Sequence, residues 1–438
     1  MADSSDLTNG RGGLTDAASS QLIYDWNTAG RIQPAATGRI ALFDQTLRDG
    51  LQAPSVQDPS PEDKRRLLHL MAALGISGAD IGLPAAGPRM LAQVRDLAAE
   101  IMRQHLPIAA SCAARTVVAD IEPIVRVSQA TGCPIEAATF VGSSELRHFV
   151  EGWSLDALLR STEQAIGYAV TQGLAVMFVA EDASRTRPET LRRLCAAALD
   201  AGAARICLAD TAGHATPAGV AALIEFVRRE FSGVASGRIG LDWHGHRDRG
   251  LAIANCLAAI DAGADRIHGT GLGIGERAGN AEMDLLLVNL RLMGRHEVDL
   301  SRLPEYCALV SAATGIPMPA NYPVMGRDAF RTGSGTHAAA ILKAERKGMP
   351  QLADLVYSGV PATEFGLAQQ ITVSSHSGIS NVRHWLGGHG YDPDDRQASG
   401  AILAAAKQSA RTLTDEECHR LARTAGARST IGAADAGN

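Results

Sequence analysis

Eight short apolar runs, each followed by a longer segment of helical periodicity, occupy residues 38–296 and limit what this sequence can fold into. We expect strands at 39–44, 78–82, 107–111, 134–140, 174–179, 205–209, 238–243 and 265–269. Amphipathic segments lie between the runs, and several begin with Pro, a favoured first residue of a helix. The clearest of these segments are 61–74, 88–105, 155–172, 188–201 and 217–231.

This alternation is typical of βα units around a parallel sheet. Eight such units match a (β/α)8 TIM barrel, and an open, doubly wound sheet is the alternative α/β fold. In a barrel, reactive side chains follow the carboxyl ends of the strands. Polar residues follow every apolar run here: Asp44, Arg48, Asp49, Asp80, Arg115, Ser143, Ser144, Glu181, Asp182, Asp210, Thr211, His244, His246 and Thr270. Their regular placement favours the barrel.

The pattern changes after residue 296, where a loop-rich segment contains Pro304, Pro317, Pro319 and Pro323. Helical patterns resume near Ala338 and Gln397. We therefore expect a flexible leader at 1–37, a catalytic barrel at 38–296, a smaller and mostly helical accessory region at 297–425, and a disordered tail at 426–438.

Charge and composition exclude several kinds of partner. The net charge is -6, so the chain offers no basic field for nucleic acid or an anionic membrane. It has no uncharged apolar window of transmembrane length, and its first residues lack the features of a signal peptide. The seven cysteines stand singly, as reduced thiols do. These features predict a cytoplasmic protein that acts on small molecules.

Two histidines and one aspartate form a candidate metal site. His244 and His246 are two residues apart at the end of an apolar run, so a strand would point both imidazoles to one face. Asp49 follows the first run, and the first and seventh strands of a closed barrel are two positions apart. This ligand set suits Zn, Mn, Fe or Co, with Mg also possible, and leaves positions open for substrate and water.

Two loops flank this candidate site. Residues 44–52 read DQTLRDGLQ and place Arg48 and Gln52 beside Asp49, so that Arg48 could stabilise negative charge on an enolate or alkoxide. Residues 271–280 read GLGIGERAGN, whose backbone amides could hold an anion and whose Asn280 could reach the metal.

These two segments resemble barrel enzymes of the family of 2-isopropylmalate, homocitrate and citramalate synthases, and more distantly hydroxymethylglutaryl-CoA lyase. The resemblance spans about residues 39–386, with its strongest signatures at 44–52 and 244–280. Weaker matches include residues 80–84 and 210–213. Segments 321–337 and 357–366 resemble the accessory region of the synthases, which favours a synthase over a lyase.

The resemblance implies an acyltransferase that condenses acetyl-CoA with a 2-oxo acid to give a 2-substituted malate and free CoA. It implies that a divalent ion (Mg, Mn, Zn or Co) binds Asp49, His244, His246 and Asn280, that Arg48 is catalytic, and that Thr211 contacts the 2-oxo acid. His337 and Tyr357 match catalytic residues that such synthases insert into a neighbouring subunit, which implies a homodimer with active sites completed in trans. His337 is the candidate base.

The acceptor depends on positions where this chain departs from the family pattern. Arg247 stands where the family has Asn after the metal-binding histidines, and Arg147 where isopropylmalate synthases often have His. Met177 and Val179 replace residues that hold the distal carboxylate in homocitrate synthases. We expect Gln52, Asp80, Arg147, Thr211 and Arg247 to contact substrate. The two arginines favour a dianionic acceptor such as phosphonopyruvate or oxaloacetate, with 2-oxoisovalerate as the alternative.

Three other functions compete with the synthase. An acyl-CoA lyase of the same barrel would run a related reaction in the cleaving direction. A non-haem iron oxygenase also uses two histidines and one carboxylate. A binding protein without catalysis would tolerate loss of Asp49.

Overall fold

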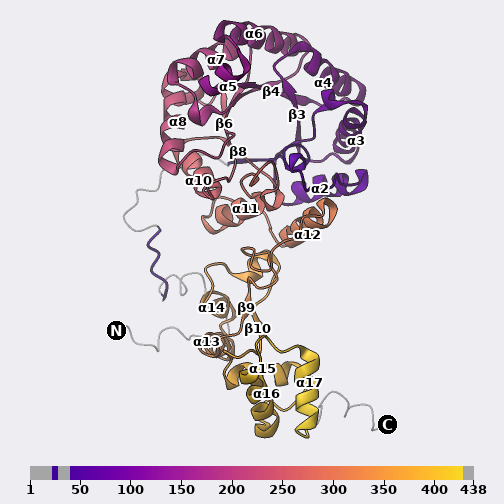
Figure 1. Ribbon diagram of the computed structural model, residues 1–438, viewed down its shortest axis with the longest axis vertical. Coiled ribbons are helices and arrows are strands. Elements are labelled where there is room, and N and C mark those ends of the chain that lie inside the picture. Colours follow the sequence, from indigo (N-terminus) through magenta and orange to yellow (C-terminus); the bar gives the residue numbers. More distant parts are fainter. Residues whose placement is uncertain (1–21, 28–39, 428–438) are drawn as a thin grey trace. The chain divides into compact units, whose positions relative to one another are not determined.

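The eight strands close into a parallel barrel in which β1 pairs with both β2 and β8 (Figure 1). The structure is a computed structural model that describes residues 22–27 and 40–427. The strands are β1 Ala41–Asp44, β2 Gly78–Asp80, β3 Ala109–Arg115, β4 Ile135–Gly142, β5 Val176–Glu181, β6 Arg205–Asp210, β7 Gly240–Gly245 and β8 Arg266–Gly269. Closure confirms the predicted TIM barrel and excludes the open sheet.

The predicted strands are correct within a few residues, and β3 differs most. We expected it at 107–111, whereas it pairs with β4 from Ala110 to Arg115. Small residues continue this strand past its last aliphatic side chain, so a search for apolar runs ends it too early.

A ring of helices surrounds the strands (Figure 1). The main ones are α2 Pro61–Ala73, α3 Pro88–Gln104, α4 Val118–Thr131, α6 Leu155–Thr171, α7 Pro188–Asp200, α8 Pro217–Glu230, α10 Ala252–Ala262 and α11 Met283–Leu292, and the shorter α5 Glu145–Glu151 and α9 Ser232–Ala235 lie between them. Local chemistry fixes several starts. The Ser60 side chain accepts a hydrogen bond from Asp63 N and precedes Pro61, an N-cap followed by Pro at the first helical position.

The compact unit that contains the barrel ends at Met318, beyond the boundary that we expected at residue 296. The reason is α12 Leu303–Thr314, which packs against α2. Its Tyr306 is fully buried and donates a hydrogen bond of 2.5 Å to Asp44 at the end of β1. The last barrel helix and α12 therefore belong to one unit.

Residues from Pro319 onward form a second compact unit that is mostly helical, as predicted. Its helices are α13 Gly335–Arg346, α14 Pro350–Leu355, α15 Ile379–Gly388, α16 Arg396–Gln408 and α17 Asp415–Thr424, beside a short sheet of β9 Arg331–Thr332 and β10 Gln370–Ile371. Val382, Leu386 and Ile402 belong to its core. The expected leader and tail fall largely on residues 1–21, 28–39 and 428–438, outside the described residues. Among the described helices, none has both the length and the apolar character that a membrane crossing requires.

Candidate active site

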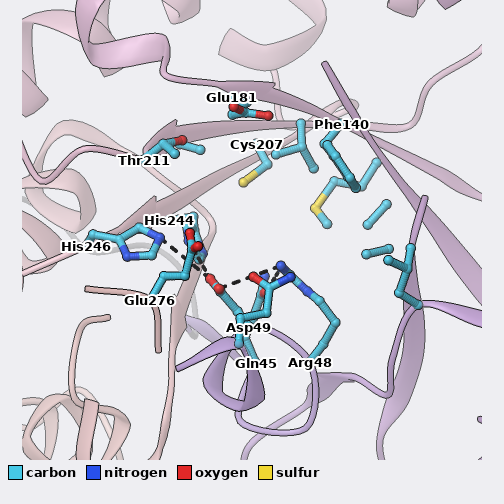
Figure 2. A pocket seen from close by; sticks show the side chains of 17 residues that line it. Gln45, Arg48, Asp49, Phe140, Glu181, Cys207, Thr211, His244, His246 and Glu276 are labelled. Carbon is cyan, nitrogen blue, oxygen red and sulfur yellow. Dashed lines mark hydrogen bonds and ion pairs between the residues drawn. The ribbon is translucent and has the colours of Figure 1, made fainter. Parts of the chain in front are cut away.

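A pocket opens at the carboxyl ends of the barrel strands, and one side of it is polar (Figure 2). Arg48, Asp49 and Gln52 come from the loop after β1, while His244 and His246 come from the end of β7. The remaining polar lining residues are Gln45, Glu181, Thr211 and Glu276. The structure thus brings six of the residues predicted from the sequence into one cavity.

Asp49, His244 and His246 meet as the sequence predicted. The Asp49 carboxylate lies 3.2 Å from Nε2 of His244 and 3.7 Å from Nε2 of His246, and one candidate ligand atom from each residue lies within 4.8 Å of the others. The two imidazole rings stand 5.3 Å apart at 70° to each other (Figure 2). One cation could contact all three side chains.

The electrostatics of these residues fit a metal ion. Burial raises the pKa of Asp49, but Arg48 and the two histidines lower it further, so the carboxyl is held well below its ordinary pKa. Burial, together with repulsion from His244, lowers the pKa of His246 to about 4. At neutral pH the site therefore offers an ionised carboxylate and a neutral imidazole, the protonation states that bind metals.

Asn280 supplies a fourth candidate ligand. A β-bridge between His246 and Asn280 holds the glycine-rich loop beside the histidines. The Asn280 amide donates to Ile274 O at 3.1 Å, whereas its Oδ1 is buried without a donor in the described part of the chain. A Cβ on Gly279, whose φ is 104°, would overlap the carbonyl oxygen of Gly273, so the loop requires glycine there. An unpartnered buried oxygen beside three ligands fits a bound cation.

Arg48 lies at the edge of the cluster of Asp49, His244 and His246, and Figure 2 shows it beside Gln45, one of its two buried partners. Its Nε donates to Asp80 at 2.8 Å, and one Nη donates to the side-chain oxygen of Gln45. Asp80 is fully buried and does not line the pocket, although we expected it to contact substrate. Its carboxylate instead accepts from Arg48 and from Gly82 N, which makes it a support for Arg48.

The opposite side of the pocket is apolar. It consists of residues from β3, β4, β5 and β6 and from the segment after β2: Leu83, Ala113, Ala138, Phe140, Met177, Val179, Cys207 and Ala209. Glu181 follows the wall residue Val179 by two positions on β5. Burial raises the pKa of Glu181, and Arg147 opposes this shift. Arg48 is the one cationic side chain apart from histidine among the described residues that line the pocket.

Comparison with known proteins identifies the family. Residues 39–310 match the family model described as HMGL-like, which covers the whole barrel. The chain belongs to the HMGL-like family. It is 33% identical over 361 residues to the homocitrate synthase of Methanopyrus kandleri, covering 81% of this chain and 84% of that protein. It is 32% identical over 362 residues to a probable 2-isopropylmalate synthase of Ignicoccus hospitalis, with the same two coverages. The resemblance seen in the sequence is confirmed.

A solved structure supports the fold of this HMGL-like chain. The HMG-CoA lyase of Bacillus subtilis aligns with a TM-score of 0.54 at 22% identity and covers 64% of this chain and 95% of that one. A sequence identity of 22% supports a shared barrel fold and says nothing of function. The two relatives named above extend over more of the chain than the lyase does.

The two arginines expected at the substrate lie outside the pocket lining of this HMGL-like barrel. Arg247 donates to Ala278 O and to Glu282, both at 2.6 Å, and so braces the glycine-rich loop. Arg147 lies 3.3 Å from Glu151 and 3.9 Å from Glu181. Both guanidinium groups have carboxylate partners: Glu151 lies on the same helix as Arg147, whereas Glu181 and Glu282 come from other segments.

His337 and Tyr357 are brought together within the accessory unit. Their rings stack with centroids 3.8 Å apart and planes inclined by 21°. His337 lies on α13 and Tyr357 follows α14, so the packing of these two helices creates the pair. Their predicted roles at the active site remain predictions.

The sequence-based list of site residues omitted the apolar wall and four pocket residues with polar or ionisable side chains: Gln45, Glu181, Cys207 and Glu276. Glu181 and Glu276 carried a signal, since one follows the fifth strand and the other lies within the glycine-rich loop. Gln45 and Cys207 carried no such signal. For an uncharged residue within a motif or a strand, the sequence pattern does not tell whether the side chain lines a pocket or packs in the core.

Proposed function

We propose that this HMGL-like protein condenses acetyl-CoA with a 2-oxo acid, hydrolyses the thioester and releases CoA. The observation that carries the proposal is the cluster of Asp49, His244 and His246 beside Arg48 in one pocket. The names of the relatives, homocitrate synthase and 2-isopropylmalate synthase, support this reaction class.

Several of the polar side chains have a role in this reaction. Asp49, His244, His246 and Asn280 would hold a divalent ion (Mg, Mn, Zn or Co), which supplies Lewis-acid polarisation of the acceptor carbonyl. The N–H groups of Arg48 that Asp80 and Gln45 leave free would stabilise negative charge on the acceptor oxygen as the new bond forms. The Thr211 hydroxyl accepts from Asp182 N at 2.9 Å, so its own proton is available to the acceptor carboxylate.

The lining favours an acceptor with a compact apolar side chain, such as 2-oxoisovalerate. The wall that includes Phe140, Met177 and Val179 offers a second anionic group no cation, and Glu181 and Glu276 would repel it. Arg147 and Arg247, which favoured phosphonopyruvate in the sequence, are paired with carboxylates. We therefore place phosphonopyruvate and oxaloacetate behind 2-oxoisovalerate.

Release of free thiol from acetyl-CoA tests both parts of the proposal. The metal-loaded protein is incubated with pyruvate, 2-oxoisovalerate, 2-oxoglutarate, oxaloacetate and phosphonopyruvate separately, and Asp49→Ala serves as the matched inactive control. Fastest release with 2-oxoisovalerate is the expected result. No release with any acceptor would contradict the condensation, and the acyl-CoA lyase would then be tested by cleavage of a hydroxyacyl-CoA. Fastest release with phosphonopyruvate would contradict the acceptor alone.

We further propose a homodimer in which His337 and Tyr357 of one subunit complete the site of the other. Their close stacking keeps an imidazole and a phenol side by side, and both groups can give or accept a proton. A mixture of Arg48→Met chains with His337→Ala chains, after subunit exchange, should regain part of the activity that each lacks alone. Failure to regain activity in a mixture shown to contain mixed dimers would contradict completion in trans.

A further inference from the structure

A continuous line of buried hydrogen bonds connects the interior of the barrel with Arg48. Asp242 on β7 accepts from Arg205 at 2.8 Å, from Arg266 at 2.6 Å and from Nε2 of His268 at 2.9 Å. His268 lies on β8, is almost completely buried, and faces Nε2 of Gln45 across 2.8 Å with its Nδ1. The oxygen of Gln45 accepts from Arg48.

The chemistry of its two ends determines the direction of every bond in this line. A guanidinium has only donors, so the Gln45 group that faces Arg48 must be the carbonyl oxygen, and its NH2 must face His268. Nδ1 of His268 must then be the acceptor. At the other end, Asp242 is held as a carboxylate by two guanidinium groups and accepts only, so Nε2 of His268 carries the proton.

We propose that His268 is a positioning residue for catalysis, because its Nε2–H tautomer, set by Asp242, orients the Gln45 amide so that the carbonyl holds Arg48. His268 does not line the pocket and acts through Gln45, which does. The inference rests on the proposed condensation, in which Arg48 stabilises developing charge.

Arg48 needs this second support because its bond to Asp80 fixes only one edge of the guanidinium. With Nε on Asp80 alone, the group could rotate about its long side chain, and the free N–H groups would lose their aim into the pocket. Gln45 provides the second point of attachment. A flipped amide would present NH2 to Arg48, two donors facing each other, so the orientation of Gln45 decides whether Arg48 is held or repelled.

Two substitutions of His268 separate positioning from packing. Asn approximates Nδ1 of histidine and can accept from Gln45, whereas Gln approximates Nε2 and can donate to Asp242 without serving Gln45. Under the proposal His268→Gln lowers kcat about tenfold, the loss of one oriented hydrogen bond, while His268→Asn stays within about threefold of wild type. The KM for acetyl-CoA should be unchanged in both, since Arg48 acts at the acceptor.

A double-mutant cycle tests the connection through Gln45. Gln45→Met removes the acceptor for Arg48 with little change in size, and its effect on kcat should match that of His268→Gln. The double variant should then lose no more than either single variant, because both break the same line. Additive losses, or a larger loss in His268→Asn than in His268→Gln, would overturn the proposal and leave a packing role. Thermal unfolding of each variant shows that it has folded.

The tautomer can be measured without any activity. In the Mg²⁺-loaded protein labelled with 15N-histidine, His268 should show a protonated Nε2 and an unprotonated, hydrogen-bonded Nδ1. The His268→Asn spectrum assigns its resonance, and Gln45→Met should shift Nδ1 alone. A proton on Nδ1 would overturn the proposal. If the enzyme releases no CoA with any acceptor but this tautomer is found, the proposed function fails while the orientation of Gln45 stands.

Discussion

Replacing Arg48 with methionine should separate a catalytic loss from a folding loss. Two of the guanidinium contacts are structural, to Asp80 and Gln45, and its remaining donors are free to act in the pocket. Removing one preorganised donor from a site where charge develops lowers kcat by about 100- to 1000-fold. We expect Arg48→Met to lower kcat in this range.

The same substitution leaves Asp80 buried with one backbone donor, Gly82 N at 3.2 Å. Removing one partner of a buried ion pair lowers the free energy of unfolding by about 3–5 kcal/mol. Adding Asp80→Asn removes the uncompensated charge and keeps an oxygen for Gly82 N, so the double variant should recover most of this stability. It should not recover kcat, because the missing donors are still missing.

Two measurements on the same preparations test this reasoning. Free-thiol release at saturating acetyl-CoA and acceptor gives kcat, and urea unfolding gives the free energy of unfolding. If Arg48→Met/Asp80→Asn regains kcat to within about tenfold of wild type, Arg48 acts through the fold rather than on the reacting atoms. If Arg48→Met alone unfolds at the wild-type urea concentration, the buried ion pair does not carry the energy assigned to it.

Three further outcomes are expected. Arg247→Met should lower the free energy of unfolding by about 1–2 kcal/mol without changing the ratio of kcat/KM between phosphonopyruvate and 2-oxoisovalerate, since Arg247 contacts Ala278 O and Glu282; a changed ratio would place it at the substrate. Mn²⁺ or Zn²⁺, at about 100 times its Kd for the wild type, should stabilise the chelator-treated protein by about 2.7 kcal/mol in thermal unfolding. An equal stabilisation of Asn280→Ala at the same ion concentration would show that the Asn280 side chain is no ligand. Burial raises the pKa of Asp44 from 3.8 to about 6, so the folded protein favours the neutral carboxyl, and the free energy of unfolding of the wild type falls as pH rises from 3.8 through 6. Urea unfolding of Asp44→Asn across this range should show a smaller fall than wild type. Parallel plots of the free energy of unfolding against pH would contradict the pKa assignment.

The barrel was predictable because its strands and helices differ in length and in the period of their apolar residues. The same alternation occurs eight times, so an error in one element does not change the predicted fold. The compact unit extends past the expected boundary at residue 296 for a physical reason: α12 packs against α2, and its Tyr306 donates a hydrogen bond to Asp44 at the end of β1. A hydrogen bond across 262 residues leaves no local pattern in the sequence.

The candidate metal site was predictable because strand geometry alone relates His244 to His246, and barrel closure brings Asp49 to them. The partners of the arginines were not. Arg247 pairs with an acid 35 residues away, and the 223 residues between Gln45 and His268 hide a contact that decides how Arg48 is held. Sequence spacing therefore predicted the two candidate ligands at the end of one strand, whereas the residues that hold the arginines in place become visible only in the closed fold.

The unequal walls of the pocket bear on which acceptor is used. A side chain of the size of valine gains about 1.5–3 kcal/mol when it is buried against an apolar wall such as that of Phe140, Met177 and Val179. A second anion on the same wall gains none of this and loses hydration without a cation to replace it, a cost of at least several kcal/mol. Glu181 adds repulsion to that cost. Under the proposed function we therefore expect the acceptor preference to follow the lining of the pocket, which does not include Arg147 or Arg247, rather than the presence of these two arginines in the sequence.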